Sequence, residues 1–188
     1  MPRVPDATDP GWVLVVAADA VRGMALFRLL EWAGHRANVV DTARSALEML
    51  EREPFELVLL DATLPDGFVV LRELRSDPRN GRLPVLLVAL EDEGDTLGPW
   101  VELGADDVVT EPFVPALVRA RVNACLVRKR LSDRDIEHRK DMERMVGAVV
   151  AAHQGALDEA SFAAIVRRFD PLGRLGRAPR RIAAEQDP

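Results

Sequence analysis

Residues 56–65 read ELVLLDATLP, and this stretch decides the fold class. Four apolar residues, Leu57 to Leu60, stand in a row and are followed at once by Asp61. A continuous Val/Leu run, rather than an alternating one, is typical of a parallel strand that is buried on both faces. Asp61 therefore marks the carboxyl end of a central strand.

Four further apolar runs share this character and are spread along the chain: Trp12–Ala17, Asn38–Val40, Pro84–Leu90 and Asp107–Thr110. A helical pattern follows each of the five runs, over Ala20–Ala33, Ala43–Glu53, Phe68–Arg75, a short helix from about Pro99 to Leu103, and a long helix from about Pro115. Strict strand–helix alternation predicts a doubly wound (βα)5 sheet covered by helices. In such folds the working site lies at the carboxyl ends of the strands.

The bulk composition fits a folded protein without a membrane span. The chain has 188 residues, of which 48% are hydrophobic and 30% charged, and no apolar run reaches the roughly 18 residues that a spanning helix needs. A single cysteine, Cys125, suits a reducing cytoplasm. Residues 1–118 hold 10 Lys/Arg and 21 Asp/Glu, a net charge of −11, whereas residues 119–188 hold 15 and 10, a net charge of +5. The two halves therefore present different surfaces.

The residues at the strand ends resemble those of the bacterial response-regulator receiver family, whose fold is CheY-like with strand order 2-1-3-4-5. The matching segments are Leu59–Pro65, Gly104–Asp107 and Glu111–Phe113. In that family an acidic pair and an aspartate hold a magnesium ion, and the aspartate accepts a phosphoryl group. A hydroxyl residue and a lysine then bind the phosphoryl oxygens.

Carried over position by position, the resemblance assigns one surviving chemical residue. The acceptor falls on Asp61, the acidic pair on Ala17 and Ala18, the hydroxyl position on Ala89 and the lysine position on Glu111. The aromatic residue that accompanies the hydroxyl becomes Val108. Asp19 would supply a metal ligand only if the first strand were shifted along the chain, and the helix spacing argues against that shift.

These substitutions remove the chemistry that the family uses. Magnesium requires oxygen ligands, and two alanines supply none. Glu111 replaces a cation near Asp61, and a unit charge pair at ~4 Å in an effective dielectric of ~20 is worth about 4 kcal/mol. We therefore expect no enzymatic phosphoryl transfer, no cofactor, and magnesium binding that is weak or absent. We also hypothesise that Asp61 and Glu111 crowd each other, so that one of them has a raised pKa.

The family's output face is built from the helix near Pro99, the strand at 107–110 and the helix from Pro115. We name Trp100, Val108 and Phe113 as candidate partner contacts on it, although a core role is the favoured interpretation for Trp100.

The C-terminal part predicts a helical extension. The helix from Pro115 runs on through a weak coiled-coil heptad (Leu117, Ala124, Leu131, His138 and Met145), and a second helix is expected over Asp158–Phe169 after a stop at Gly155. Such helices cannot bury their apolar stripes alone, so docking or homodimerisation is expected. The candidate dimer residues are Leu131, Met142, Met145 and Val149.

The extension has two other functional interpretations, RNA binding and phosphotransfer. Arg139–Phe169 resembles the RNA-binding ANTAR module at Met142, at Met145–Gly147 and at Arg167 and Arg168, but it lacks that module's basic residue and third helix. His138 lacks the surroundings of a phosphotransfer histidine and is interpreted as a solvated helix residue.

The sequence thus predicts a disordered segment (1–11), a receiver-like domain (12–127), a helical extension (128–169) and a disordered tail (170–188). The leading interpretation is a pseudo-receiver that recognises protein partners in a cytoplasmic signalling pathway and dimerises. An RNA-binding antiterminator and a conventional regulator phosphorylated at Asp61 are the alternatives.

Overall fold

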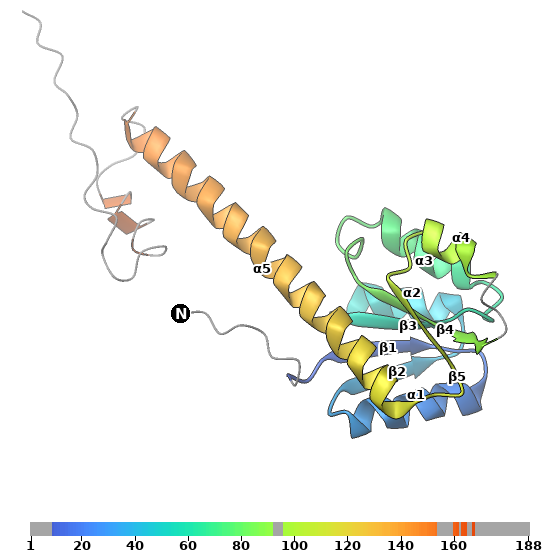
Figure 1. Cartoon of the computed structure of the whole chain (residues 1–188). Helices are drawn as coiled ribbons and strands as arrows, with labels where there is room; N and C mark the ends of the chain where they lie inside the picture. Colours follow the sequence, from blue (N-terminus) through green and yellow to red (C-terminus); the bar gives the residue numbers. More distant parts are fainter. Residues whose placement is uncertain (1–8, 92–95, 154–159, 162, 165–166, 168–188) are drawn as a thin grey trace, which may run out of the picture. The chain divides into compact units, whose positions relative to one another are not determined.

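A computed structural model of the chain describes residues 9–91, 96–153, 160–161, 163–164 and 167. The chain divides into two compact units, Met1–Leu131 and Ser132–Pro188, and the first contains the sheet and the helices around it (Figure 1). The expected disordered ends fall largely on residues 1–8 and 168–188, which lie outside the described residues.

Five parallel strands form one sheet. They are β1 (Trp12–Val16), β2 (Arg36–Val40), β3 (Leu57–Asp61), β4 (Val85–Leu90) and β5 (Asp107–Glu111). Their order is β2-β1-β3-β4-β5, which confirms the predicted doubly wound fold. Val16 pairs with Val40 on one side and with Leu60 on the other. This register ends β1 just before Ala17, so the first strand is not shifted.

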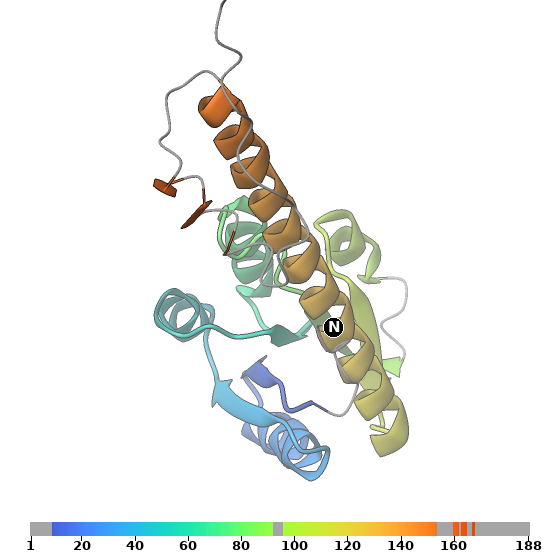
Figure 2. The same cartoon turned by 90° about the vertical axis from the view of Figure 1, so that its left-hand side faces the viewer.

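Helices cover both faces of the sheet (Figures 1 and 2). They are α1 (Ala20–Trp32), α2 (Ala43–Arg52), α3 (Gly67–Ser76), α4 (Gly98–Glu102) and α5 (Pro115–His153). Buried residues of α1 and α5 share one core cluster with the sheet, whereas those of α2, α3 and α4 share the other. None of the helices in the described part of the chain combines the length and apolar character that a membrane crossing requires.

Each central strand supplies both cores. Along β1, Leu14 and Val16 face α2 and α3, while Val13 and Val15 face α1 and α5. All four side chains are fully buried. Burying one Val or Leu side chain stabilises the folded state by about 1.5–3 kcal/mol. Because both faces of the strand are buried, apolar residues are favoured at every position, and the run is continuous.

Local signals set the helix ends. Asp19 caps α1, because its carboxylate accepts hydrogen bonds from the backbone N–H groups of Val21 and Arg22. Gly34, at φ 87°, lets the chain turn after α1 in a conformation that residues with a Cβ rarely adopt. Pro99 lies in the first turn of α4, as predicted, and α4 has only 5 residues.

The C-terminal predictions are tested only in part. Helix α5 is described as far as His153, and the expected stop at Gly155 and most of the predicted helix over Asp158–Phe169 lie outside the described residues. The same holds for much of the ANTAR-like segment. The described part of that segment, residues 139–153, is continuous helix.

Arg75 ties α3 to two loops at the opposite, amino end of the strands. Its guanidinium donates to the backbone carbonyls of Leu83 (2.8 Å) and Gly104 (2.7 Å) and to the Asp106 carboxylate (2.9 Å). Asp106 in turn accepts from the N–H of Val85 at 2.8 Å. Two residues of the Gly104–Asp107 segment are therefore structural.

Trp100 belongs to the core, which is the role favoured for it from the sequence, and it is therefore removed from the candidate partner contacts. Its side chain is 3% exposed, and its ring stacks on Phe68 with centroids 3.9 Å apart. Because α4 is so short, the helix stays close to α3 and its one tryptophan fills the space between them. Val101, the next residue, is the one that faces solvent.

His35 links the turn after α1 to α5. The backbone N–H of Gly11 donates to its Nδ1 at 3.1 Å, so the ring proton resides on Nε2 and is donated to Asn123 Oδ1 at 3.0 Å. Burial lowers the pKa of His35, and this effect exceeds that of the Asn123 hydrogen bond, which raises it. The fold therefore favours the neutral ring.

We expect His35 to make the domain less stable in acid. A folded-state pKa below the unfolded value of about 6.5 means that the unfolded chain binds the proton better, so the free energy of unfolding falls as the pH drops below about 6.5. The measurement is chemical denaturation across this range for the wild type and His35→Gln. The stability advantage of the wild type should shrink as the pH falls; an advantage that stays constant would contradict the prediction.

Candidate functional site

The carboxyl edge of the sheet brings the predicted site residues together. Ala17 and Ala18 follow β1, Asp61 ends β3 and Glu111 ends β5. Ala89 lies in β4, between the strands that carry the two carboxylates. Asp61 and Ala89 are fully buried and Ala17 is nearly so. The alanines contribute only methyl groups, so among the residues that match the five chemical positions of the family Asp61 and Glu111 are the acids.

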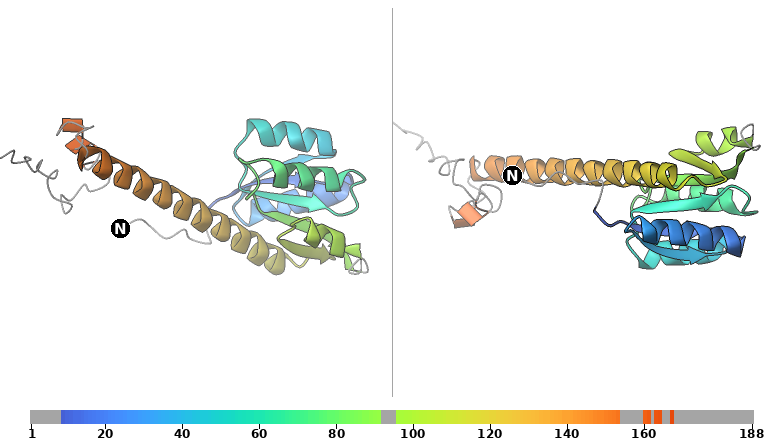
Figure 3. Two further views of the ribbon diagram at one scale, coloured as in Figure 1. Left: turned by 90° about the horizontal axis from the view of Figure 1, so that it is seen from above. Right: turned by 60° about the horizontal axis from the view of Figure 1, so that its bottom comes forward.

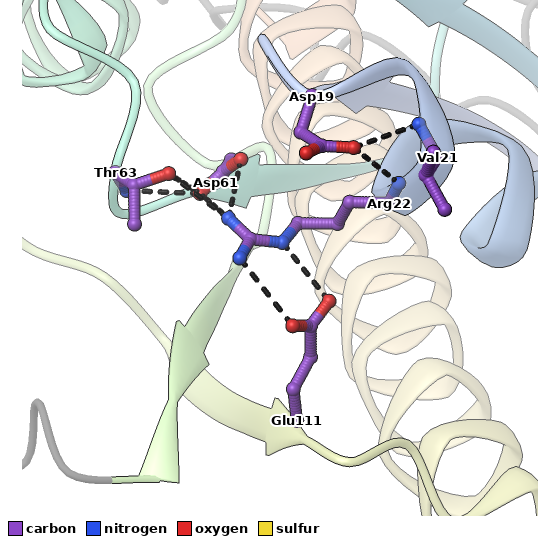
Figure 4. Close-up of polar contacts among 6 residues, drawn as sticks. All are labelled: Asp19, Val21, Arg22, Asp61, Thr63 and Glu111. Atoms are coloured by element: carbon purple, nitrogen blue, oxygen red, sulfur yellow. Dashed lines mark hydrogen bonds and ion pairs between the residues drawn. The ribbon is translucent and has the colours of Figure 1, made fainter.

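Arg22, in the first turn of α1, reaches across this edge and binds both carboxylates (Figure 4). Its Nη1 donates to the two Asp61 oxygens at 2.7 and 2.8 Å. Its Nε donates to Glu111 Oε1 at 2.9 Å, and its Nη2 lies 3.4 Å from Glu111 Oε2. One guanidinium thus joins α1, β3 and β5.

This arrangement corrects the expectation that Asp61 and Glu111 face each other without a cation between them. The Arg22 side chain is only 11% exposed, and it places a full positive charge against both acids. The repulsion predicted from Asp61 and Glu111 alone is therefore offset. Arg22 is not among the residues that directly follow a strand, because it lies one helical turn further on, so the strand ends alone do not predict it.

Both oxygens of Asp61 accept hydrogen bonds, and Oδ1 accepts the most. In addition to Arg22, Oδ1 accepts from the Thr63 backbone N–H at 2.9 Å and from the Thr63 hydroxyl at 2.7 Å. Thr63 Oγ1 itself accepts from Arg22 Nη1 at 2.9 Å. The loop after β3 therefore folds back on the carboxylate and shares the same guanidinium.

The electrostatics favour a permanently charged Arg22. The hydrogen bond to Glu111, followed by the bond and charge of Asp61, raises the pKa of Arg22 above its ordinary value, although partial burial acts in the opposite direction. Hydrogen bonds between charged groups are about twice as strong as neutral ones. The three side chains carry a combined charge of −1.

Asp19 caps helix α1 and is not placed as a metal ligand. One of its oxygens accepts from the N–H groups of Val21 and Arg22 at 2.7 and 2.9 Å, and these bonds lower its pKa. The cap also fixes the first turn of α1, which is the turn that carries Arg22. Asp19 is thus part of the scaffold that aims the guanidinium.

The residues present do not fit a magnesium ion at this edge. Ala17 and Ala18 offer no oxygen, and both Asp61 oxygens accept from Arg22. Among the described residues, no group of three or more His, Cys, Asp or Glu side chains is placed to hold a metal ion. A hard cation needs several oxygen ligands, and here a guanidinium engages the available ones.

An open cleft of about 890 Å³ adjoins Arg22. It lies between the start of α1, the end of β4 and the β5–α5 connection, and its lining includes Leu90 and Phe113. Phe113 and Val108, both candidate partner contacts, are half-buried. Of that predicted set, only Phe113 lines this cleft.

The candidate dimer residues lie on α5 and differ in exposure. Leu131, Met142 and Val149 are 43%, 56% and 41% exposed. Met145 is half-buried. Two further residues, Val146 and Val150, are exposed on the same helix and extend the apolar surface.

Comparisons with known proteins point to one family. The model of the response regulator receiver domain matches residues 13–123. The transcriptional activator protein IrlR of Burkholderia pseudomallei is 36% identical over 146 residues, which are 76% of this chain and 62% of IrlR. The chain thus spans less than two thirds of that relative.

Solved receiver structures share the fold. The receiver domain of the Francisella response regulator 1452 has a TM-score of 0.56 at 25% identity and covers 63% of this chain and 98% of its own. A receiver domain of a Pseudomonas aeruginosa sensor histidine kinase, solved with magnesium in its active site cleft, has a TM-score of 0.56 at 24% identity with the same coverage.

Removing the Arg22 charge should destabilise the domain strongly. Arg22→Met keeps the apolar stem but leaves the buried Asp61 without its cation, which costs about 3–5 kcal/mol in comparable pairs. The measurement is the free energy of unfolding in urea. Adding Asp61→Asn to Arg22→Met should restore part of the loss, because the buried charge is then gone.

The matched control is Arg44→Met, which removes an arginine that is 89% exposed and pairs with Glu48 on α2. An exposed pair of this kind contributes about 0.3–0.5 kcal/mol. If Arg22→Met cost no more than Arg44→Met, Arg22 would not compensate Asp61.

Proposed function

The chain belongs to the response regulator receiver domain family of two-component signalling, and from this premise we propose that its receiver is a pseudo-receiver. It works by recognising protein partners without being phosphorylated, and it has no phosphotransfer activity. One observation carries the proposal: Arg22 engages both oxygens of Asp61, the acceptor position.

An engaged carboxylate is a poor nucleophile. To attack phosphorus, Asp61 would have to release Arg22, and its oxygens would lose the only cation that contacts them among the described residues. Since Asp61 is fully buried, an unpaired charge there is costly. The ion pair therefore opposes the first step of phosphoryl transfer.

The product would be opposed as well. A phosphoryl group brings about −2 charge, and the edge already has a combined charge of −1 from Asp61, Glu111 and Arg22. Catalysis of phosphoryl transfer rests on neutralising and positioning that charge. The Pseudomonas aeruginosa receiver holds magnesium in its cleft, whereas the alanines and the paired Asp61 in this chain support no such ion.

Partner recognition and self-association are the remaining routes to a signal. We place self-association on α5, where Met142, Val146 and Val149 are exposed at spacings of four and three residues and so lie on one side of the helix. A second copy of the chain would cover them. Partner binding is proposed for the receiver unit.

Beryllofluoride with magnesium tests the loss of phosphorylation. We expect no saturable change in the amide NMR signals of Asp61, Thr63 and Ala89 in the full chain. Arg22 occupies the Asp61 carboxylate and repels magnesium, and Glu111 repels the beryllofluoride anion. A conventional receiver measured in parallel provides the positive control. Saturable shifts around Asp61 would show that the acceptor is competent.

Self-association is tested on α5. Met142→Glu with Val149→Glu should convert a dimer to a monomer in sedimentation velocity, because charges buried in an apolar seam are costly. Glu143→Gln, an exposed polar position on the same helix, is the control and should leave the assembly unchanged. A wild-type chain that is monomeric at every concentration would refute the dimer.

A further inference from the structure

The outer face of α1 carries several large apolar side chains that are exposed to solvent. Its inner face packs Leu26 and Leu30 into the core, yet Val21, Met24 and Trp32 are 80%, 51% and 66% exposed. The exposed positions of α2, by contrast, are all charged: Arg44, Glu48, Glu51 and Arg52. A helix that is apolar all round is normally covered all round.

Trp32 is the largest of these side chains and is held in place by α5. The guanidinium of Arg119 lies over its ring, 5.5 Å from the centroid. The arrangement is anchored nearby, because His35 donates to Asn123, which follows Arg119 by one helical turn. Trp32 therefore lies where α1 and α5 come into contact. The right-hand view of Figure 3 brings α1 toward the viewer.

The charge around Trp32 is positive. Arg28 precedes Trp32 by four residues and so shares its side of α1, and Arg119 flanks the ring. Neither arginine forms an ion pair among the described residues, unlike Arg22 and Arg130. Glu31 is the nearest acid in the sequence: it points about 100° away from Trp32 around the helix, lies three residues after Arg28, and forms no ion pair with Arg28 in the described part of the chain.

We propose that Met24, Arg28, Trp32 and Arg119 form a docking patch for a protein segment that combines acidic and large apolar side chains. An apolar anchor would cover Trp32 and Met24, and carboxylates would pair with Arg28 and Arg119. Tryptophan and arginine are the residues most enriched at binding hot spots, and a fixed ring and guanidinium lose little entropy on binding.

A protein segment fits this patch better than nucleic acid does. The patch holds two guanidiniums, whereas residues 1–118 carry a net charge of −11. Nucleic-acid affinity depends on neutralising many phosphates, and two guanidiniums neutralise only a few of them. A short acidic segment carries few charges, and the two arginines are enough to pair with them.

The inference rests on the proposed function, since it names the chemistry of a partner that the pseudo-receiver recognises. The two fail separately. Beryllofluoride binding at Asp61 would refute the pseudo-receiver proposal but would not bear on the docking patch. The binding experiment below tests the patch alone.

The experiment uses the full chain and a fluorescein-labelled synthetic helical peptide with glutamates on one face and leucines on the other. Saturable anisotropy is expected with this peptide and not with its lysine counterpart. Trp32→Ala and Arg119→Glu should each weaken binding by about 10-fold or more. Added salt should weaken it further.

Arg44→Glu on α2 is the matched control, because it changes the net charge as much as Arg119→Glu does but at an exposed site away from the patch. Equal weakening by both charge variants would reduce the effect to net charge and overturn the patch. So would absence of binding to the acidic peptide, or equal binding to single-stranded RNA. Thermal unfolding of each variant checks that the fold is intact, and Trp32→Phe, which keeps an aromatic anchor, should bind better than Trp32→Ala.

Discussion

The ion pair between Arg22 and the buried Asp61 is the constraint on which the carboxyl edge depends. Asp61 is fully buried at the end of a central strand, and a buried carboxylate needs a cation or a set of donors. In the receiver family a metal and a lysine meet that need. Here Arg22 meets it, from a helix whose first turn is fixed by the Asp19 cap.

Arg22 also explains Glu111. A lysine at that position would bring a second cation against the guanidinium, whereas a glutamate gives the Nε and Nη2 donors an acceptor. The replacement that looked repulsive beside Asp61 is thus attractive beside Arg22. Because the cation is part of α1, the contacts among α1, β3 and β5 do not depend on a diffusible ligand. A ligand changes the conformation of a protein only by binding one state better than another, so the ion pair by itself gives this edge no ligand-dependent switch.

Much of the fold was predictable from the sequence, because it follows from local patterns. Two-sided burial makes the runs of β1, β3 and β4 continuous, and Pro99 fixed the start of α4. The edge strand β2 begins at Arg36, two residues before the predicted start, because a half-exposed strand includes polar residues that interrupt the apolar run. The role of Arg22 was not predictable, because 39 residues separate it from Asp61 and 89 from Glu111. The periodicity of a sequence does not predict which distant residue the end of a long side chain contacts.

The two tryptophans at helix positions show why surfaces are harder to predict than cores. Trp100 and Trp32 both stand in apolar helical stretches, and only Trp100 was named as a candidate partner contact, although a core role was favoured for it. The structure stacks Trp100 on Phe68 and leaves Trp32 beside Arg119 at the seam of α1 and α5. Periodicity identifies an apolar face but not whether a neighbouring helix covers it. Only the packing of α4 against α3, and of α5 beside α1, decides which ring is available to a partner.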